Sequence, residues 1–108
     1  MKVRIISALV LLASFNAAAE TSSCSSAAIV QAEKLLSFHT DGDDRAEIDS
    51  NAKQLPSLTN PANKSQKLAV FEVMGYVYKG EYRMRLIYYP VGNECVLIGQ
   101  EILELASL

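Results

Sequence analysis

Two cysteines are the first side chains of this 108-residue chain whose type and position point to chemistry. Cys24 and Cys95 are the only cysteines, and in an oxidising compartment an isolated pair forms a disulfide. The bond would close a loop of about 70 residues, for which the chain-entropy estimate is on the order of 4 kcal/mol. A metal site would need further ligands, and His39 has no metal-ligand spacing to either cysteine. We therefore predict a Cys24–Cys95 disulfide and no metal.

His39 is the only histidine and hence the natural general base near neutral pH. Asp41, Asp43 or Glu47 could orient its ring. The structural alternative is a histidine in the last turn of a helix, where it complements the helix dipole and meets solvent. Because no Gly-x-Ser-x-Gly motif and no convincing nucleophile accompany His39, we expect the structural role and assign no catalytic residue.

The densest run of carboxylates begins at Asp41 and could hold Ca²⁺. An EF-hand loop needs a glycine at its sixth position and a glutamate at its twelfth, and these positions are occupied by Ala46 and Ala52. A helix cap explains the acidic residues better, because Asp44 and Glu47 have the spacing of a capping box. We expect a solvated loop leading into a helix.

Tyrosines and arginines interleave on one face of a predicted β-hairpin. The β-rich runs 68–78 and 81–89 flank Lys79-Gly80, a candidate two-residue turn that would pair Phe71 with Tyr88. One face of this hairpin is apolar throughout. A slip by one residue would bury the arginines, so burial enforces the division of the residues between the two faces. The other face would pair Met74 with Arg85 and Tyr76 with Arg83, and it also carries Glu72, Glu81 and Ile87. Five residues of this face are called the Tyr/Arg face below: Met74, Tyr76, Tyr78, Arg83 and Arg85.

The Tyr/Arg face has several interpretations. Tyr and Arg are enriched in binding hot spots, and cross-strand pairing would stack one on the other. On an ordinary solvated face the same pairs only stabilise the sheet, and a second helix or a second subunit could also cover it. Bases of single-stranded nucleic acid stack on tyrosines too. The functional hypothesis is a surface that binds another protein.

The first nineteen residues determine where this face would work. Lys2 and Arg4 form a positive region, residues 5–13 form an apolar region interrupted only by Ser7, and 17–19 are three alanines. This is the layout of a secretory signal peptide cut before Glu20. No later stretch reaches the roughly 18 apolar residues of a membrane span. We expect a periplasmic or secreted protein without an integral membrane segment.

Cleavage would leave residues 20–108, a single small domain of 89 residues once the 19 of the signal are subtracted from 108. Loss of Lys2 and Arg4 leaves eight basic and twelve acidic residues, so the net charge changes from −2 to −4. An acidic domain lacks the basic footprint that nucleic acids and anionic membranes require.

Residues 20–26 are polar and rich in serine, and we expect them to form an irregular lead-in before the first helix of the domain. Ala28, Ala32, Leu35 and Leu36 share one stripe with Cys24, which predicts a helix from about Cys24 to Phe38. A second, short helix would follow the capping box at Asp44 and end before Pro56, because Ile48, Ala52 and Leu55 recur at helical spacing. Residues 58–65 would be a connector.

A third strand follows Gly92-Asn93, a second two-residue turn. Alternation after this turn places Cys95, Leu97 and Gly99 on the apolar face, where the first helix must pack. A bulge near Gly99-Gln100 would return Ile102 to the core. The predicted fold is α+β: one or two N-terminal helices on a three-stranded antiparallel meander, with one helix-to-sheet disulfide.

Two functional classes are compatible with this fold. The first is a small exported non-catalytic binding module that uses the Tyr/Arg face, such as an inhibitor, an immunity-type protein or an envelope accessory protein. The alternative is a very small secreted hydrolase, such as a ribonuclease, using His39 with arginine and carboxylate partners. Because His39 ends a helix packed on the opposite face, we favour the binding module, with no cofactor and with a protein partner.

Overall fold

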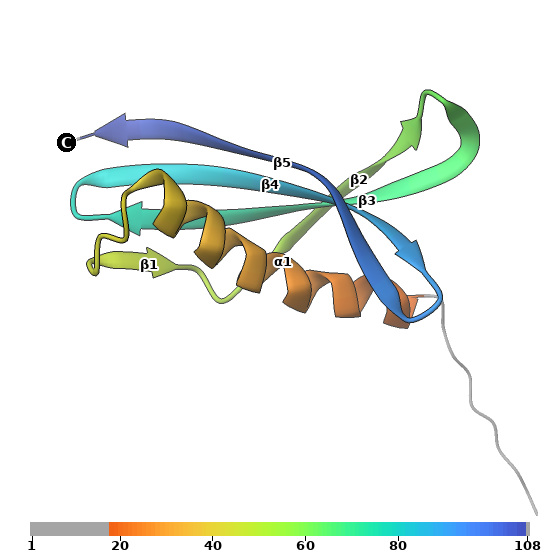
Figure 1. Cartoon of the computed structure of the whole chain (residues 1–108), viewed down its shortest axis with the longest axis horizontal. Helices are drawn as coiled ribbons and strands as arrows, with labels where there is room; N and C mark the ends of the chain where they lie inside the picture. The colour runs from red at the N-terminus through yellow and green to blue at the C-terminus, as the bar shows by residue number, and fades with distance from the viewer. Residues whose placement is uncertain (1–17, 108) are drawn as a thin grey trace, which may run out of the picture.

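One helix packed on an antiparallel sheet makes up the part of the chain that the computed structural model describes, residues 18–107, with side chains for residues 24–105 (Figure 1). The predicted signal peptide, residues 1–19, lies outside these residues apart from Ala18 and Ala19, which begin the helix. The elements are α1 (Ala18–His39), β1 (Ala46–Ile48), β2 (Lys53–Asn60), β3 (Asn63–Val77), β4 (Gly80–Val91) and β5 (Glu94–Ser107).

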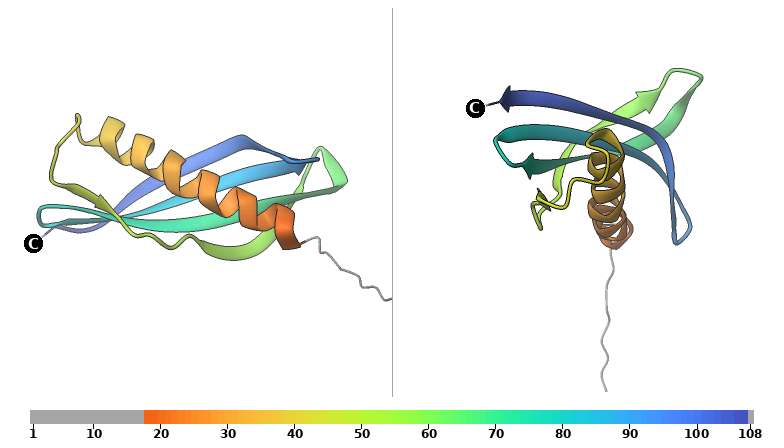
Figure 2. Two further views of the ribbon diagram at one scale, coloured as in Figure 1. Left: turned by 90° about the horizontal axis from the view of Figure 1, so that it is seen from below. Right: turned by 60° about the vertical axis from the view of Figure 1, so that its left-hand side comes forward.

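The sheet is built around β3, which is long enough to pair with three other strands. β4 pairs with one side of β3, and β5 continues the sheet beyond β4. On the other side, β2 pairs with the first part of β3, and β1 pairs with its last residues, Gly75–Val77. The sheet twists and curls along the helix (Figure 2). The inner face below is the face that contacts α1, and the outer face is the opposite one.

The core lies between the inner face and a stripe of small residues on α1. Cys24, Ala28, Ala32 and Leu36 recur every fourth residue, and all four are fully buried, as their spacing predicts. Small side chains let the helix approach the sheet closely, and the strands supply the larger groups. The sheet residues of this core are Ala69, Phe71, Val73, Val77, Tyr82, Met84, Leu86 and Tyr88.

Gly75 allows the Leu36 side chain of α1 to pack directly against β3. A Cβ atom at this position would lie 2.9 Å from the Leu36 side chain and 2.9 Å from Met84. The absent side chain therefore leaves the space that the end of Leu36 occupies, and this close approach accounts for a glycine inside a buried strand.

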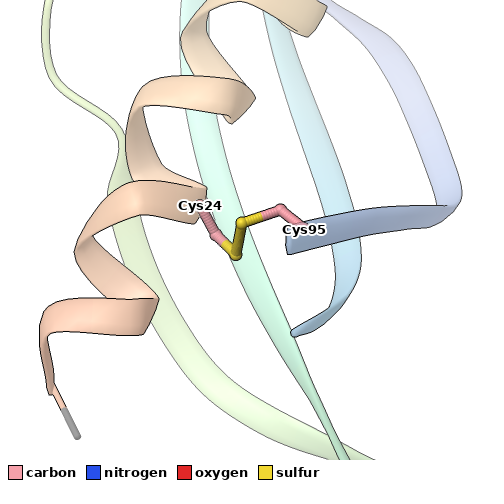
Figure 3. Close-up of a disulfide and its surroundings, with 2 residues drawn as sticks. All are labelled: Cys24 and Cys95. Atoms are coloured by element: carbon pink, nitrogen blue, oxygen red, sulfur yellow. A yellow bond between two sulfur atoms is a disulfide. The ribbon is translucent and has the colours of Figure 1, made fainter. Parts of the chain in front are cut away.

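The predicted disulfide is confirmed. Cys24 of α1 and Cys95 of β5 are bonded, with their Cα atoms 5.5 Å apart and 71 positions apart in the chain (Figure 3). The bond joins the first half of the helix to β5, the strand at the edge of the sheet beyond β4. It is the kind of cross-link expected outside the cytoplasm, which agrees with a periplasmic or extracellular location.

Two predictions about helices are wrong. The lead-in 20–26 belongs to α1, and no second helix forms, because residues 46–48 and 53–60 are the strands β1 and β2. The carboxylate of Asp43 accepts the backbone N–H of Arg45, which turns the chain where a capping box would start a helix. The expected connector 58–65 is also strand except for the turn at residues 61–62, since Asn60 and Asn63 close the β2–β3 hairpin. The sheet thus has five strands among the described residues, instead of three.

The β3–β4 hairpin has the predicted faces but different partners. Its turn is Tyr78-Lys79, and Gly80 is already in β4. Phe71 therefore pairs with Leu86, where Tyr88 was expected. Because the shift is two residues, every side chain that pairs in the ladder stays on its predicted face; Tyr78 lies in the turn instead.

The β4–β5 hairpin confirms the turn at Gly92-Asn93, where Gly92 has φ of +58°. Its bulge lies one residue before the predicted place: Leu97 pairs with Tyr88 and Gly99 pairs with Ile87, so Ile98 is the extra residue. Ile102 returns to the core as expected. Gly99 does not lie on the inner face, because the bulge moves it to the outer face beside Ile87.

Candidate binding surface

The outer face carries four of the five residues of the Tyr/Arg face. Met74 lies opposite Arg83 across the β3–β4 ladder, and Tyr76 lies opposite Glu81. Arg85 follows Arg83 by two residues, so it emerges on the same side. Met74, Tyr76, Arg83 and Arg85 are all half-buried, and α1 packs on the other side of the sheet. Alternation along two strands thus brings them to one surface that the helix leaves open.

The arginines lie beside glutamates, and the expected stacking of Tyr76 on an arginine is wrong. Arg83 Nε lies 3.5 Å from Glu72 Oε2, and Arg85 Nη1 lies 3.9 Å from Glu101 Oε1. Lys53, Glu72, Arg85 and Glu101 are in register across β2, β3, β4 and β5, so the sign of the charge alternates along this row. Partly exposed pairs of this kind contribute at most about 1 kcal/mol each. The row therefore adds little stability, but it presents a charge pattern that a partner could match.

Apolar side chains adjoin this charged row. Val70 pairs with Leu55 on one side and with Ile87 on the other, and it is almost fully buried although it lies on the outer face. Tyr89 pairs with Val96, whose side chain is 43% exposed. The outer face thus combines an apolar and aromatic area with a polar row, as binding surfaces do. Leu55 was missed as part of it because helical spacing had assigned it to a helix.

Tyr76 is a hydrogen-bond donor on this surface at neutral pH. Partial loss of contact with water raises the pKa of its hydroxyl above the ordinary 10.0, and the carboxylates of Asp49 and Glu81 raise it further. The neighbouring carboxylates disfavour a phenolate, so the hydroxyl keeps its proton well above physiological pH.

Tyr78 is separated from the rest of the Tyr/Arg face by its place in the turn. Its φ is +56°, a left-handed conformation that is uncommon for a bulky residue, and it is 69% exposed. The Arg45 guanidinium lies 4.7 Å from the centre of its ring, and Lys79 Nζ lies 5.4 Å from it. Its cationic neighbours are therefore Arg45 and Lys79. The predicted pairing of the β3–β4 hairpin could not indicate Arg45, which lies in a different part of the chain.

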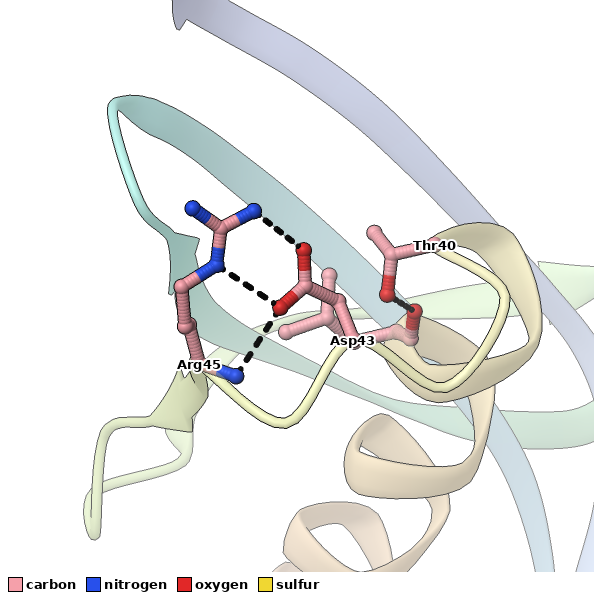
Figure 4. Close-up of polar contacts among 4 residues, drawn as sticks. Thr40, Asp43 and Arg45 are labelled. Carbon is pink, nitrogen blue, oxygen red and sulfur yellow. Dashed lines mark hydrogen bonds and ion pairs between the residues drawn. The ribbon is translucent and has the colours of Figure 1, made fainter.

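Arg45 is held in place by Asp43 (Figure 4). Arg45 Nε donates to Asp43 Oδ1 at 3.0 Å, and Nη2 donates to Oδ2 at 2.7 Å. These hydrogen bonds lower the pKa of the Asp43 carboxyl from 3.8 to about 2. Asp43 therefore orients the cation that contacts Tyr78, and the loop after α1 is tied to the β3–β4 turn.

His39 lies on the other side of the sheet from the arginines. Its ring meets the edge of the Tyr82 ring, with the centroids 5.6 Å apart, and Tyr82 belongs to the inner-face core. Arg83 and Arg85 point to the outer face. The described structure does not bring together the base and the cationic groups that the hydrolase alternative requires.

We expect His39→Ala to change the free energy of unfolding by at most about 1 kcal/mol, because an exposed histidine at a helix end contributes only a dipole interaction and one edge contact. Urea denaturation measures this change. Any activity found in the protein should survive the substitution. Loss of an activity with the fold intact would favour the hydrolase over the binding module.

A cavity of about 350 Å³ opens beside the end of α1. Its lining residues are Glu33, Leu36, Ser37, Gly42, Asp43, Asp44, Ala46 and Ile48. Acidic groups face it, but Asp43 is engaged by Arg45. Within the described residues, no three or more His, Cys, Asp or Glu side chains gather as metal ligands would.

Comparison with protein-family models, with curated proteins and with solved structures found no match to this chain. Among the described residues, no helix is both long enough and apolar enough to cross a membrane.

Proposed function

We propose that this chain is a small exported binding module, such as an inhibitor, an immunity-type protein or an envelope accessory protein, and that the outer face of its sheet binds another protein. The observation that supports this most is the surface around Tyr76. Half-buried Met74 and Tyr76 lie there on one side of the row of alternating charges, and half-buried Ile87 lies on the other side of this row, all on the face that α1 does not cover. Aromatic and arginine side chains in such a setting are the usual anchors of protein interfaces.

A photo-crosslinking amino acid in place of Tyr76 tests which protein contacts this face in the native exported compartment. The matched control carries the same group in place of Phe38, which is 86% exposed on α1. A partner captured from position 76 and not from position 38, and identified by mass spectrometry, is the expected result. Equal capture from both positions would contradict the proposal.

For a partner found in this way, we expect Tyr76→Ala or Arg83→Ala to weaken binding by more than about 2 kcal/mol, or roughly 30-fold in Kd. Lys34→Ala, on an exposed part of α1, is the control and should leave the Kd unchanged. Isothermal titration calorimetry measures the affinity, and circular dichroism verifies the fold. If the face only meets water, these variants will alter stability by about 0.5 kcal/mol or less and leave binding unaffected.

A further inference from the structure

The outer edge of β5 is unpaired among residues 18–107. β4 takes all the strand pairing on one side of β5, and no described strand pairs with the other side (Figure 1). An open edge presents a row of backbone donors and acceptors that another extended segment can use. Most proteins protect such an edge or use it for binding.

The two edges of the sheet differ in how they are protected. The opposite edge is formed by β1, which has three residues, and by β2, which contains Pro56 and two register shifts. In β5, a second extra residue, Leu105, follows Glu104, and Gly99–Glu104 lies between the two bulges in unbroken register with β4. This segment contains no proline, lysine or arginine, the residues that commonly block edge pairing.

The side chains of Gly99–Glu104 define what could pair with it. Leu103 is 49% exposed, and the segment has two charged residues, Glu101 and Glu104, both exposed. Glu101 has only a 3.9 Å contact to Arg85, and its side chain remains 58% exposed. The two glutamates are three residues apart, so they lie on opposite faces of the strand, with Ile102 and Leu103 between them.

A second copy of this chain is a poor occupant of the edge. Pairing of two β5 strands over this segment would bring the Glu101 and Glu104 side chains of both copies together, and like charges across a strand pair are destabilising. A complementary segment instead carries lysine or arginine three positions apart, with two apolar residues between them.

We propose that Gly99–Glu104 binds an extended protein segment of this basic–apolar–apolar–basic pattern as an additional strand of the sheet. Backbone hydrogen bonds supply the pairing, and the two glutamates select the spacing of the basic residues. This docking uses the edge of β5 and does not depend on a role for the Tyr/Arg face.

The probe is the synthetic peptide acetyl-Thr-Lys-Val-Val-Lys-Thr-amide, titrated into the ¹⁵N-labelled protein at low salt. A control peptide with the order Thr-Lys-Val-Lys-Val-Thr has the same composition, but its lysines lie two apart and thus on one face. We expect the backbone amide signals of Gly99–Glu104 to shift with the first peptide, with binding at least about tenfold tighter than for the control. N-methylation of alternate peptide amides on the edge facing β5 should abolish the shifts.

Protein variants separate this docking from general attraction of a cationic peptide to an acidic protein. Glu101→Gln with Glu104→Gln should weaken binding of the first peptide at least about tenfold, whereas Glu33→Gln with Glu47→Gln, the same change of charge elsewhere, should not. Tyr76→Ala should also leave it unchanged, so failure of the proposed outer-face function would be seen separately. Equal binding of both peptides, shifts away from Gly99–Glu104, or no binding at millimolar peptide would overturn the proposal.

Discussion

Cys95→Ala should lower the free energy of unfolding by about 2–5 kcal/mol, the usual loss when a small exported domain is deprived of a native disulfide. The bond spans 71 residues and joins α1 to β5. Its removal therefore frees a long loop in the unfolded chain and detaches the helix from the far strand of the sheet. Urea denaturation of the variant and of the wild type under non-reducing conditions measures the difference.

Reduction provides the control for this prediction. Dithiothreitol should destabilise the wild type by a similar amount and have no effect on a variant in which both Cys24 and Cys95 are alanine. Titration of the folded wild type with Ellman's reagent should detect no free thiol. Two free thiols in the native protein would show that the chain folds without the bond.

Phe71→Ala should have an effect at least as large, about 3–5 kcal/mol. Phe71 is 1% exposed between the helix and the sheet, and its ring meets the edge of the Tyr88 ring with the centroids 6.3 Å apart. The substitution removes this contact and leaves a cavity that the backbone of a central strand cannot collapse to fill. Because small domains are stable by only about 5–15 kcal/mol, a measurable fraction of the variant molecules should be unfolded at moderate temperature. Thermal and chemical denaturation measure both effects.

Phe38→Ala is the matched control, since it deletes the same side chain at a position that is 86% exposed. It should alter stability by about 0.5 kcal/mol or less. A similar loss at both positions would mean that Phe38 is covered in solution, whereas a small loss at Phe71 would contradict the described core.

Alternation of apolar and polar residues was the most reliable guide to this fold. It placed Phe71 and Leu86 inside and Arg83 and Arg85 outside, although the predicted turn lies one residue too late in the chain and the predicted strand pairing is therefore shifted by two residues. An even shift exchanges partners without exchanging faces. The error affected the candidate binding surface, because the predicted cross-strand partners of Tyr76 and of the two arginines were wrong. The turn was predicted at Lys79-Gly80 because glycine favours turns. In the structure Gly80 pairs in β4, and Tyr78 is the turn residue with a positive φ.

Local signals failed where they agreed with more than one structure. Ile48, Ala52 and Leu55 are spaced for a helix, but Ala46 and Ile48 also alternate with exposed Glu47 as in a strand. Without β1 and β2, one edge of β3 would have unpaired backbone groups. Strand pairing at this edge is more favourable than a short helix, whose intrinsic stability is marginal.

The disulfide, the buried stripe of α1 and the two faces of the central hairpin could be predicted from the sequence, because each depends on residue type and periodicity. The strand partners, the strands formed within residues 44–65 and the contacts of Arg45 with Asp43 and Tyr78 could not be predicted in this way. Those features depend on which long-range backbone pairings compete best, and the free-energy differences between the competing pairings are small compared with the total of the interactions that form.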